Sequence, residues 1–238
     1  MDADAVALEV LDELRPLGDA ARAEHDRGYL KVDTETWGVS VPATRRAARA
    51  VAGRRPLDRD ALWAVVDRLW ASGVHDARVA AVELLDARAQ VLDPSDLDRL
   101  AALIRTAGTW ALVDGLAASV GGRLVERHPD PGPTLDRWAV DDSFWVRRAV
   151  LLVHLRALRR GEGDWDRFAR YADALADETE FFVRKAIGWV LRDTARRRPE
   201  LVVSWLEPRA RRLSAVTWRE AVKPLAPADR GRLEALRP

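Results

Sequence analysis

Cysteine is absent from this 238-residue chain. Without thiols the protein cannot form a disulfide framework, a thiolate zinc site or a cysteine nucleophile. Long apolar runs are missing too, since none approaches the roughly 20 residues needed to span a bilayer. The first residues, MDADAVALEVLDEL, have neither the basic start nor the apolar block of a secretory signal. We therefore expect a cytoplasmic protein with no membrane association.

Motifs of several enzyme classes are also missing. The four histidines (His25, His75, His128 and His154) show no metal-binding spacing such as HExxH, and we interpret each as structural. Neither a glycine-rich phosphate loop nor a GxSxG nucleophile elbow occurs. The sequence therefore predicts no metal site and no cofactor.

Charge is plentiful but unevenly distributed. Residues 1–144 carry 18 basic and 25 acidic side chains, whereas residues 145–223 carry 18 basic and 11 acidic ones. Nearly all the basic residues are arginines, whose planar guanidinium suits phosphate. The asymmetry is compatible with a polyanionic partner that approaches from one side, and equally with scatter in a charge-rich protein.

Apolar residues recur at three- and four-residue spacing along most of the chain, which is typical of amphipathic helices. No convincing run of alternating β-branched residues occurs, so we predict an all-α protein. The expected helices cover residues 3–14, 19–29, 42–51, 58–70, 75–88, 95–106, 110–126, 143–159, 166–175, 180–197 and 200–213, with a shorter helix at the C-terminus.

The sequence contains an internal repeat. The segments DARVAAV (76–82), WVRRAVL (145–151) and FVRKAIG (182–188) align, with arginines at Arg78, Arg147 and Arg184. A period of about 35–37 residues with two helices per unit is the spacing of HEAT-like arrays. We therefore predict one HEAT-like repeat domain over residues 1–238, with a repeat core of about 38–223, that forms a curved α-solenoid with a concave face.

Trp110 and Asp114 lie four positions apart and therefore share one helix face. A structural interpretation is an indole at the edge of the core beside an aspartate in a salt bridge. A functional interpretation is an aromatic wall with a carboxylate that stabilises positive charge and positions water. Spacing alone favours the structural interpretation.

Trp145 and Arg148 lie three positions apart in the next repeat. The alignment places Arg147 at the recurrent arginine position and Arg148 at the position of Val79 and Lys185. We therefore expect Arg147 to serve the scaffold and Arg148 to reach the surface, where an arginine can contact phosphate. A solvated arginine without a binding role is the alternative.

Lys185, Trp189 and Arg192 fall at positions i, i+4 and i+7, so the indole lies between two cations on one helix face. This arrangement is unusual for a core tryptophan. It suits a surface on which the ring meets a sugar or base and the cations meet phosphates.

Five segments occur in one order along the chain and together carry a family resemblance. They are GVSVPATRRAAR (38–49), HDARVAAVELL (75–85), TWALVDGLA (109–117), SFWVRRAVLL (143–152) and FFVRKAIGWVLRD (181–193). These segments resemble the DNA alkylation repair family, the AlkD-like HEAT-repeat DNA glycosylases. The resemblance covers about residues 38–193, and the flanking segments match only in helical character. Asp76 stands where the family pattern leads us to expect glutamate.

The resemblance implies a base excision repair enzyme that holds duplex DNA by its backbone on the concave face. Its substrates would be cationic N3- or N7-alkylated purines such as 3-methyladenine and 7-methylguanine. Trp110 and Trp189 would face the deoxyribose of the lesion, Asp114 would stabilise the cationic sugar and orient water, and Arg148 would hold phosphate. We expect a monomer that associates with the nucleoid when bound to DNA. Further DNA-contacting candidates are Trp145, Lys185, Arg192 and Arg147.

The expected chemistry needs few groups. A cationic base is a good leaving group, so the main requirement is to stabilise an oxocarbenium-like sugar, as in glycoside hydrolysis. No lysine is placed as a Schiff-base nucleophile, because Lys185 lies at a backbone-contact position. We therefore expect a monofunctional glycosylase without strand cleavage. The alternative is a non-catalytic helical-repeat module that binds DNA structures or acts as a protein scaffold.

Overall fold

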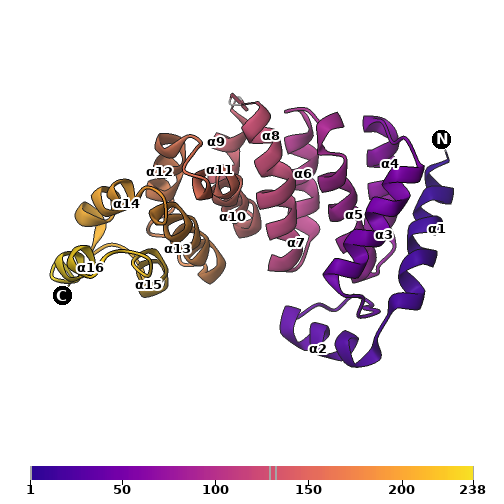
Figure 1. Cartoon of the computed structure of the whole chain (residues 1–238), viewed down its shortest axis with the longest axis horizontal. Helices are drawn as coiled ribbons and strands as arrows, with labels where there is room; N and C mark the ends of the chain where they lie inside the picture. The colour runs from indigo at the N-terminus through magenta and orange to yellow at the C-terminus, as the bar shows by residue number, and fades with distance from the viewer. Residues whose placement is uncertain (1, 129, 132, 238) are drawn as a thin grey trace. The chain divides into compact units, whose positions relative to one another are not determined.

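The computed structural model describes residues 2–128, 130–131 and 133–237. Within these ranges it is built from helices and contains no β-strand, apart from an isolated bridge between Glu35 and Val74. Figure 1 shows the elements in chain order from α1 to α16. The predicted all-helical fold class is confirmed. None of the helices described is both long enough and apolar enough to cross a bilayer.

The helices mostly follow the expected boundaries. Their bounds are α1 Ala3–Leu14, α2 Ala20–Leu30, α3 Val41–Arg54, α4 Arg59–Ala71, α5 His75–Ala87, α6 Asp96–Thr106, α7 Trp110–Asp114, α8 Gly122–Arg127, α9 Thr134–Ala139, α10 Phe144–Leu152, α11 Leu155–Arg159, α12 Trp165–Ala174, α13 Phe181–Ala195, α14 Pro199–Leu206, α15 Ala215–Ala221 and α16 Pro227–Glu234. A π-helical segment, Gly115–Gly121, joins α7 to α8, and short 3₁₀ turns follow α1, α5 and α14.

The structure differs from the expected helices in several places. The helix expected over 110–126 is divided into α7 and α8 by the π-helical segment, and the helix expected over 200–213 ends at Leu206. Helix α9 was not expected, and its six residues are too few to show a helical period. The helix expected over 143–159 is interrupted at Val153 and His154, which separate α10 from α11. Two short helices, α15 and α16, follow α14 where the sequence suggested one.

The chain divides into two compact units. Unit 1 comprises Met1–Asp96 and Thr106–Leu116, and unit 2 comprises Leu97–Arg105 and Ala117–Pro238. In unit 1, α5 packs against α3 and α4, and α1 packs against the same two helices. In unit 2, α13 packs against α10, α11, α14 and α15. A single domain over residues 1–238 stays a prediction.

Two tryptophans of α4 lie in the core of unit 1, as their seven-residue spacing suggests. Trp63 and Trp70 are buried. The Trp63 indole donates to Asp96 Oδ1 at 2.7 Å, and the Trp70 indole donates to Thr106 Oγ1 at 3.0 Å. Each ring therefore fills the core while its N–H group is satisfied.

The recurrent arginines each bind main-chain carbonyls before their own helix. Arg78 donates to Trp70 O, and Arg147 donates to Asp141 O at 2.7 Å. Arg184 donates to Glu178 O. Carbonyls at the ends of helices lack partners within the helix, so a guanidinium there fixes the interhelical loop. The prediction that the recurrent position serves the scaffold is confirmed.

Arginine–carboxylate pairs also join successive helix pairs within each unit. In many of these pairs the partners lie between 34 and 39 positions apart, which is about one repeat period. The pairs with this spacing are Arg45–Glu83 and Arg59–Asp96 in unit 1, and Arg105–Asp141, Arg137–Asp98, Arg159–Asp193, Arg160–Glu126, Arg170–Asp136, Arg209–Asp173 and Arg212–Asp177 in unit 2. Their spacing supports the helical repeat inferred from the sequence.

Gly188 sets how closely α13 and α15 approach. A Cβ atom at this position would lie 2.7 Å from Thr217 O and 2.8 Å from Glu220 Cβ. One of these two atoms belongs to the main chain, so a side-chain rotation cannot relieve the overlap. The Thr217 hydroxyl donates to Arg184 O at 2.9 Å across the same contact.

Gly188→Ala should therefore lower the free energy of unfolding by about 1–3 kcal/mol, because the methyl group forces α15 away from α13. Gly231→Ala is the matched control, since Gly231 lies in α16 and a Cβ atom added there would meet nothing within 4 Å. It should raise stability by up to about 1 kcal/mol through helix propensity. Urea denaturation measures both changes. Equal stability of the two variants would contradict the packing described.

Candidate functional site

Trp110 and Asp114 occupy the first and last positions of α7 in unit 1. Both side chains are half-buried, and the neighbouring Leu112 and Val113 are buried. The helix changes to π-helical geometry directly after Asp114. Such segments often mark functional positions. The indole and the carboxylate therefore share a partly exposed face, as their spacing predicted.

Helix α2 adds two rings to this face. Tyr29 meets Trp110 edge-on, with ring centroids 5.8 Å apart and an interplanar angle of 89°. His25 stacks on Tyr29 at 5.7 Å. Tyr29 is 61% exposed, so the ring stays accessible. Sequence reasoning missed both residues, because nothing in the spacing relates α2 to α7.

Trp189 lies half-buried on α13 in unit 2, and its orientation is fixed by Asp193. The indole N–H donates to Asp193 Oδ2 at 3.3 Å. Arg159 of α11 donates to the same oxygen at 2.8 Å, and Arg192 donates to Asp193 Oδ1 at 3.3 Å. The buried carboxylate thus accepts from three donors, which satisfies it and holds the ring.

A second carboxylate extends this network toward α15. Glu220 pairs with Arg192 and accepts from Lys223 at 2.6 Å. Burial alone raises the pKa of Glu220, but Lys223 and Arg192 together bring that pKa below its ordinary value. Arg192 therefore lies between two carboxylates, which limits its availability as a phosphate contact.

The expectation that Arg148 reaches the surface is wrong. Only 3% of the residue is exposed. Its Nη1 donates to Phe182 O at the start of α13, and its guanidinium lies 5.8 Å from the Phe182 ring centroid. The repeat alignment equates Arg148 with Val79 and Lys185, but the ring of the next repeat covers this position. Arg148 therefore links α10 to α13.

The remaining candidates of unit 2 differ in accessibility. Arg147 pairs with Glu178 at 2.7 Å in addition to its carbonyl contacts. Trp145 is half-buried and packs on Phe182, with ring centroids 5.0 Å apart. Lys185 is exposed and lies 5.7 Å from the Phe181 ring centroid. Among these candidates Lys185 is the cation best placed to meet a polyanion.

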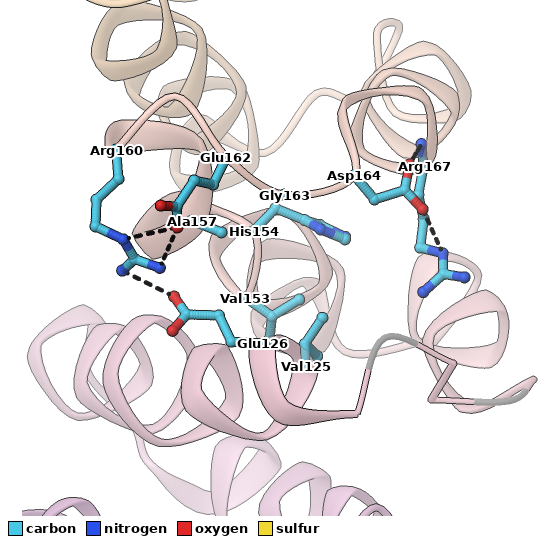
Figure 2. A pocket seen from close by; sticks show the side chains of 10 residues that line it. All are labelled: Val125, Glu126, Val153, His154, Ala157, Arg160, Glu162, Gly163, Asp164 and Arg167. Carbon is cyan, nitrogen blue, oxygen red and sulfur yellow. Dashed lines mark hydrogen bonds and ion pairs between the residues drawn. The ribbon is translucent and has the colours of Figure 1, made fainter.

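A cavity of about 220 Å³ lies elsewhere in unit 2 (Figure 2). On one side Arg160 lies between Glu126 and Glu162, and on the other Asp164 pairs with Arg167. None of the predicted site residues lines it. Its full lining is Val125, Glu126, Val153, His154, Ala157, Arg160, Glu162, Gly163, Asp164 and Arg167.

His154 forms one wall of this cavity and is buried. Its ring lies 5.9 Å from Tyr171 and 6.3 Å from Phe168, and its Nε2 has no hydrogen-bond partner within the described part of the chain. Burial lowers the pKa of His154 to about 4. The imidazole is therefore neutral at neutral pH, in keeping with the structural role expected from the sequence.

The predicted site residues offer one carboxylate, aromatic faces and cations. No group of three or more histidine, aspartate and glutamate side chains that could hold a metal ion occurs within the residues described. A half-buried carboxylate beside ring faces can stabilise a cationic centre, because both present negative charge at reduced dielectric. The α7 pair of unit 1 therefore suits stabilisation of positive charge.

Comparison with known proteins gives a consistent result. The family model described as DNA alkylation repair enzyme matches residues 10–225. A solved structure titled as a predicted DNA alkylation repair enzyme from Enterococcus faecalis superimposes with a TM-score of 0.79 at 21% identity, covering 88% of this chain and 97% of that one. At that identity the likeness concerns the fold alone. No curated protein matches the sequence significantly.

Asp193→Asn should lower the free energy of unfolding by about 1–3 kcal/mol, because the change removes a buried charge partner of Arg159 and Arg192. Asp177→Asn is the matched control, since the Asp177 side chain is 69% exposed in its pair with Arg212. Such surface pairs contribute about 0–1 kcal/mol. Chemical denaturation compares the two. If Asp193→Asn lowered the free energy of unfolding no more than Asp177→Asn does, the Asp193 network would not hold α11 to α13.

His154→Phe should make stability less sensitive to acid. The pKa of His154 falls from 6.5 unfolded to about 4 folded, so the unfolded state binds more protons between these values. The neutral imidazole therefore makes its full contribution to the free energy of unfolding above about pH 6.5. That contribution is lost as the pH falls toward 4. Relative to the variant, the parent should lose about 2 kcal/mol between pH 7 and pH 5. If the free energies of unfolding of the parent and of His154→Phe fell in parallel between pH 7 and pH 5, the burial of His154 described here would be refuted.

Proposed function

Because the chain belongs to the DNA alkylation repair enzyme family, we propose that it is a monofunctional DNA glycosylase. Its substrates are cationic N3- and N7-alkylated purines in duplex DNA, and its reaction is hydrolysis of the N-glycosidic bond in base excision repair. The family supports a role in the repair of alkylated DNA. The substrate and the reaction are our proposal.

The proposed reaction uses the positive charge of the lesion. The bond between sugar C1′ and the base nitrogen breaks, and its electron pair leaves with the base, which becomes neutral. A water oxygen then bonds to C1′ and loses one proton to solvent. The products are a free alkylpurine and an abasic sugar in an uncut strand. Because the leaving group needs no protonation, a strong general acid is unnecessary.

The observation that carries the proposal is the half-buried pair of Trp110 and Asp114 on α7. The sugar becomes cationic in the transition state, and a carboxylate and an indole face both stabilise positive charge. A preorganised carboxylate in a partly desolvated site stabilises a developing positive charge more strongly than a carboxylate in water does. We assign Asp114 to stabilise the sugar and to orient water, and Trp110 to face the deoxyribose.

We assign Trp189 as the second indole at the deoxyribose. The support is that Asp193 fixes the orientation of its ring, and a rigid side chain loses little entropy on binding. Lys185 meets the backbone, as an exposed cation suits that role. Arg148 positions α13 through Phe182 O, a role that replaces the phosphate contact expected from the sequence.

Asp114→Asn should lower the single-turnover rate of base release from methylated duplex DNA by roughly 100-fold or more, while DNA affinity changes little. The amide keeps the shape of the side chain and removes its charge. Asp98→Asn is the control. Asp98 lies on α6, and its side chain is largely exposed although it pairs with Arg137 of α9. Chromatography of free 3-methyladenine and 7-methylguanine gives the rate.

Full base release by Asp114→Asn would rule out the assigned role. Absence of release by the parent protein, together with tight and salt-dependent DNA binding, would favour a non-catalytic DNA-binding module instead.

A further inference from the structure

The arginines of this protein are mostly engaged within the protein, as the ion pairs and carbonyl contacts above show. Five described arginines differ, because their guanidinium groups have no ion-pair, hydrogen-bond or ring partner. They are Arg22, Arg46, Arg49, Arg196 and Arg197. Two of the five, Arg46 and Arg49, share one helix, α3 of unit 1.

Arg46 and Arg49 lie on the face of α3 that points away from the core. The core face consists of buried small and β-branched side chains, among them Ala47, Ala48 and Val51. Both arginines are exposed. They are three positions apart and therefore neighbours on the helix surface.

Other arginines of α3 mark the sides of this exposed face. Arg45 pairs with Glu83 of α5 at 2.8 Å, and Arg54 pairs with Glu9 of α1 at 3.0 Å. Each of these guanidinium groups is turned toward a neighbouring helix and is neutralised there. The face between them keeps its charge.

Unpaired like charges at this spacing work against folding, because cations three positions apart on a helix repel each other. No carboxylate of the described residues compensates Arg46 or Arg49. Gly53 lies on the same exposed side of α3, and a Cβ atom there would meet nothing within 4 Å. The exposed face of α3 is therefore cationic, and no side chain protrudes from it at Gly53. Such a face complements an extended anionic surface such as a nucleic-acid backbone.

We propose that Arg46 and Arg49 each bind one phosphate of duplex DNA, at a backbone contact separate from the α7 pair. The proposal rests on the proposed glycosylase function, whose substrate is duplex DNA. Within unit 1, α3 packs on α5 and α5 packs on α7. Helix α5 therefore lies between α3 and α7, and the proposed contact is separate from the bases that would lie at Trp110.

This contact should strengthen the binding of damaged and undamaged DNA alike, because phosphates carry no direct sequence information. The test uses an undamaged, fluorescein-labelled duplex of about 20 base pairs and measures fluorescence anisotropy over a range of salt concentrations. Each phosphate contact contributes about 0.9 to the slope of log K against log salt. Arg46→Gln with Arg49→Gln should lower the steepness of that slope by about 1.8 and reduce affinity roughly tenfold or more at about 0.1 M salt.

The double variant Arg54→Gln with Arg55→Gln is the matched control. It removes the same charge from the same end of the chain, but at arginines that pair with Glu9 of α1. Its slope should stay close to that of the parent protein. Thermal unfolding of both double variants checks that each is folded.

Equal slopes in the two double variants would overturn the proposed contact, and so would absence of duplex binding by the parent protein. The glycosylase assignment is tested separately. A parent protein that releases methylated bases, with an Arg46/Arg49 variant that binds DNA normally, overturns only the α3 contact. A parent protein that binds duplex through these arginines and releases no base overturns only the glycosylase.

Discussion

Helix α5 buries side chains on two sides at once, against α3 and against α4. A single pair of helices therefore cannot bury its own apolar surface, and the next pair must supply the missing contact. The arginine–carboxylate pairs about one period apart occur where successive pairs meet, and the recurrent arginines fix the intervening loops. This stacking requirement determines which helix faces remain exposed to carry function.

The two candidate rings are held in different ways. Trp110 lies at the start of a short helix and gains the edge of Tyr29 from α2. Trp189 lies in the middle of a long helix and is fixed by a buried carboxylate with two arginine partners. The ring partner of Trp110 therefore comes from another helix, whereas Asp193 lies four positions after Trp189 on the same helix. Preorganisation of this kind reduces the reorganisation needed when charge develops on a bound sugar.

The sequence predicted the longer helices and the repeat because apolar spacing and the recurrent arginine are local signals. It missed α9, whose six residues show no period, and it joined α10 to α11 across His154. It placed Trp110 and Asp114 on one face, since spacing alone decides that. It placed Arg148 at the surface, because the covering ring of Phe182 comes from the next repeat and leaves no trace in local spacing. Tyr29 was missed for the same reason, because its contact with Trp110 arises only in the fold. Asp193 was also missed, although it lies four positions after Trp189 on one helix, the same spacing that relates Trp110 to Asp114.

The central claim is that this protein hydrolyses the glycosidic bond of a cationic purine and does nothing further to the strand. The most direct measurement is a single-turnover time course on a duplex that contains one 7-methylguanine, with free base and strand length followed in the same samples. The account predicts one free base per abasic site, formed at the same rate, while the strand stays uncut until it is treated with alkali. Strand cleavage in step with base loss, or no base loss with enzyme in excess over DNA, would contradict it.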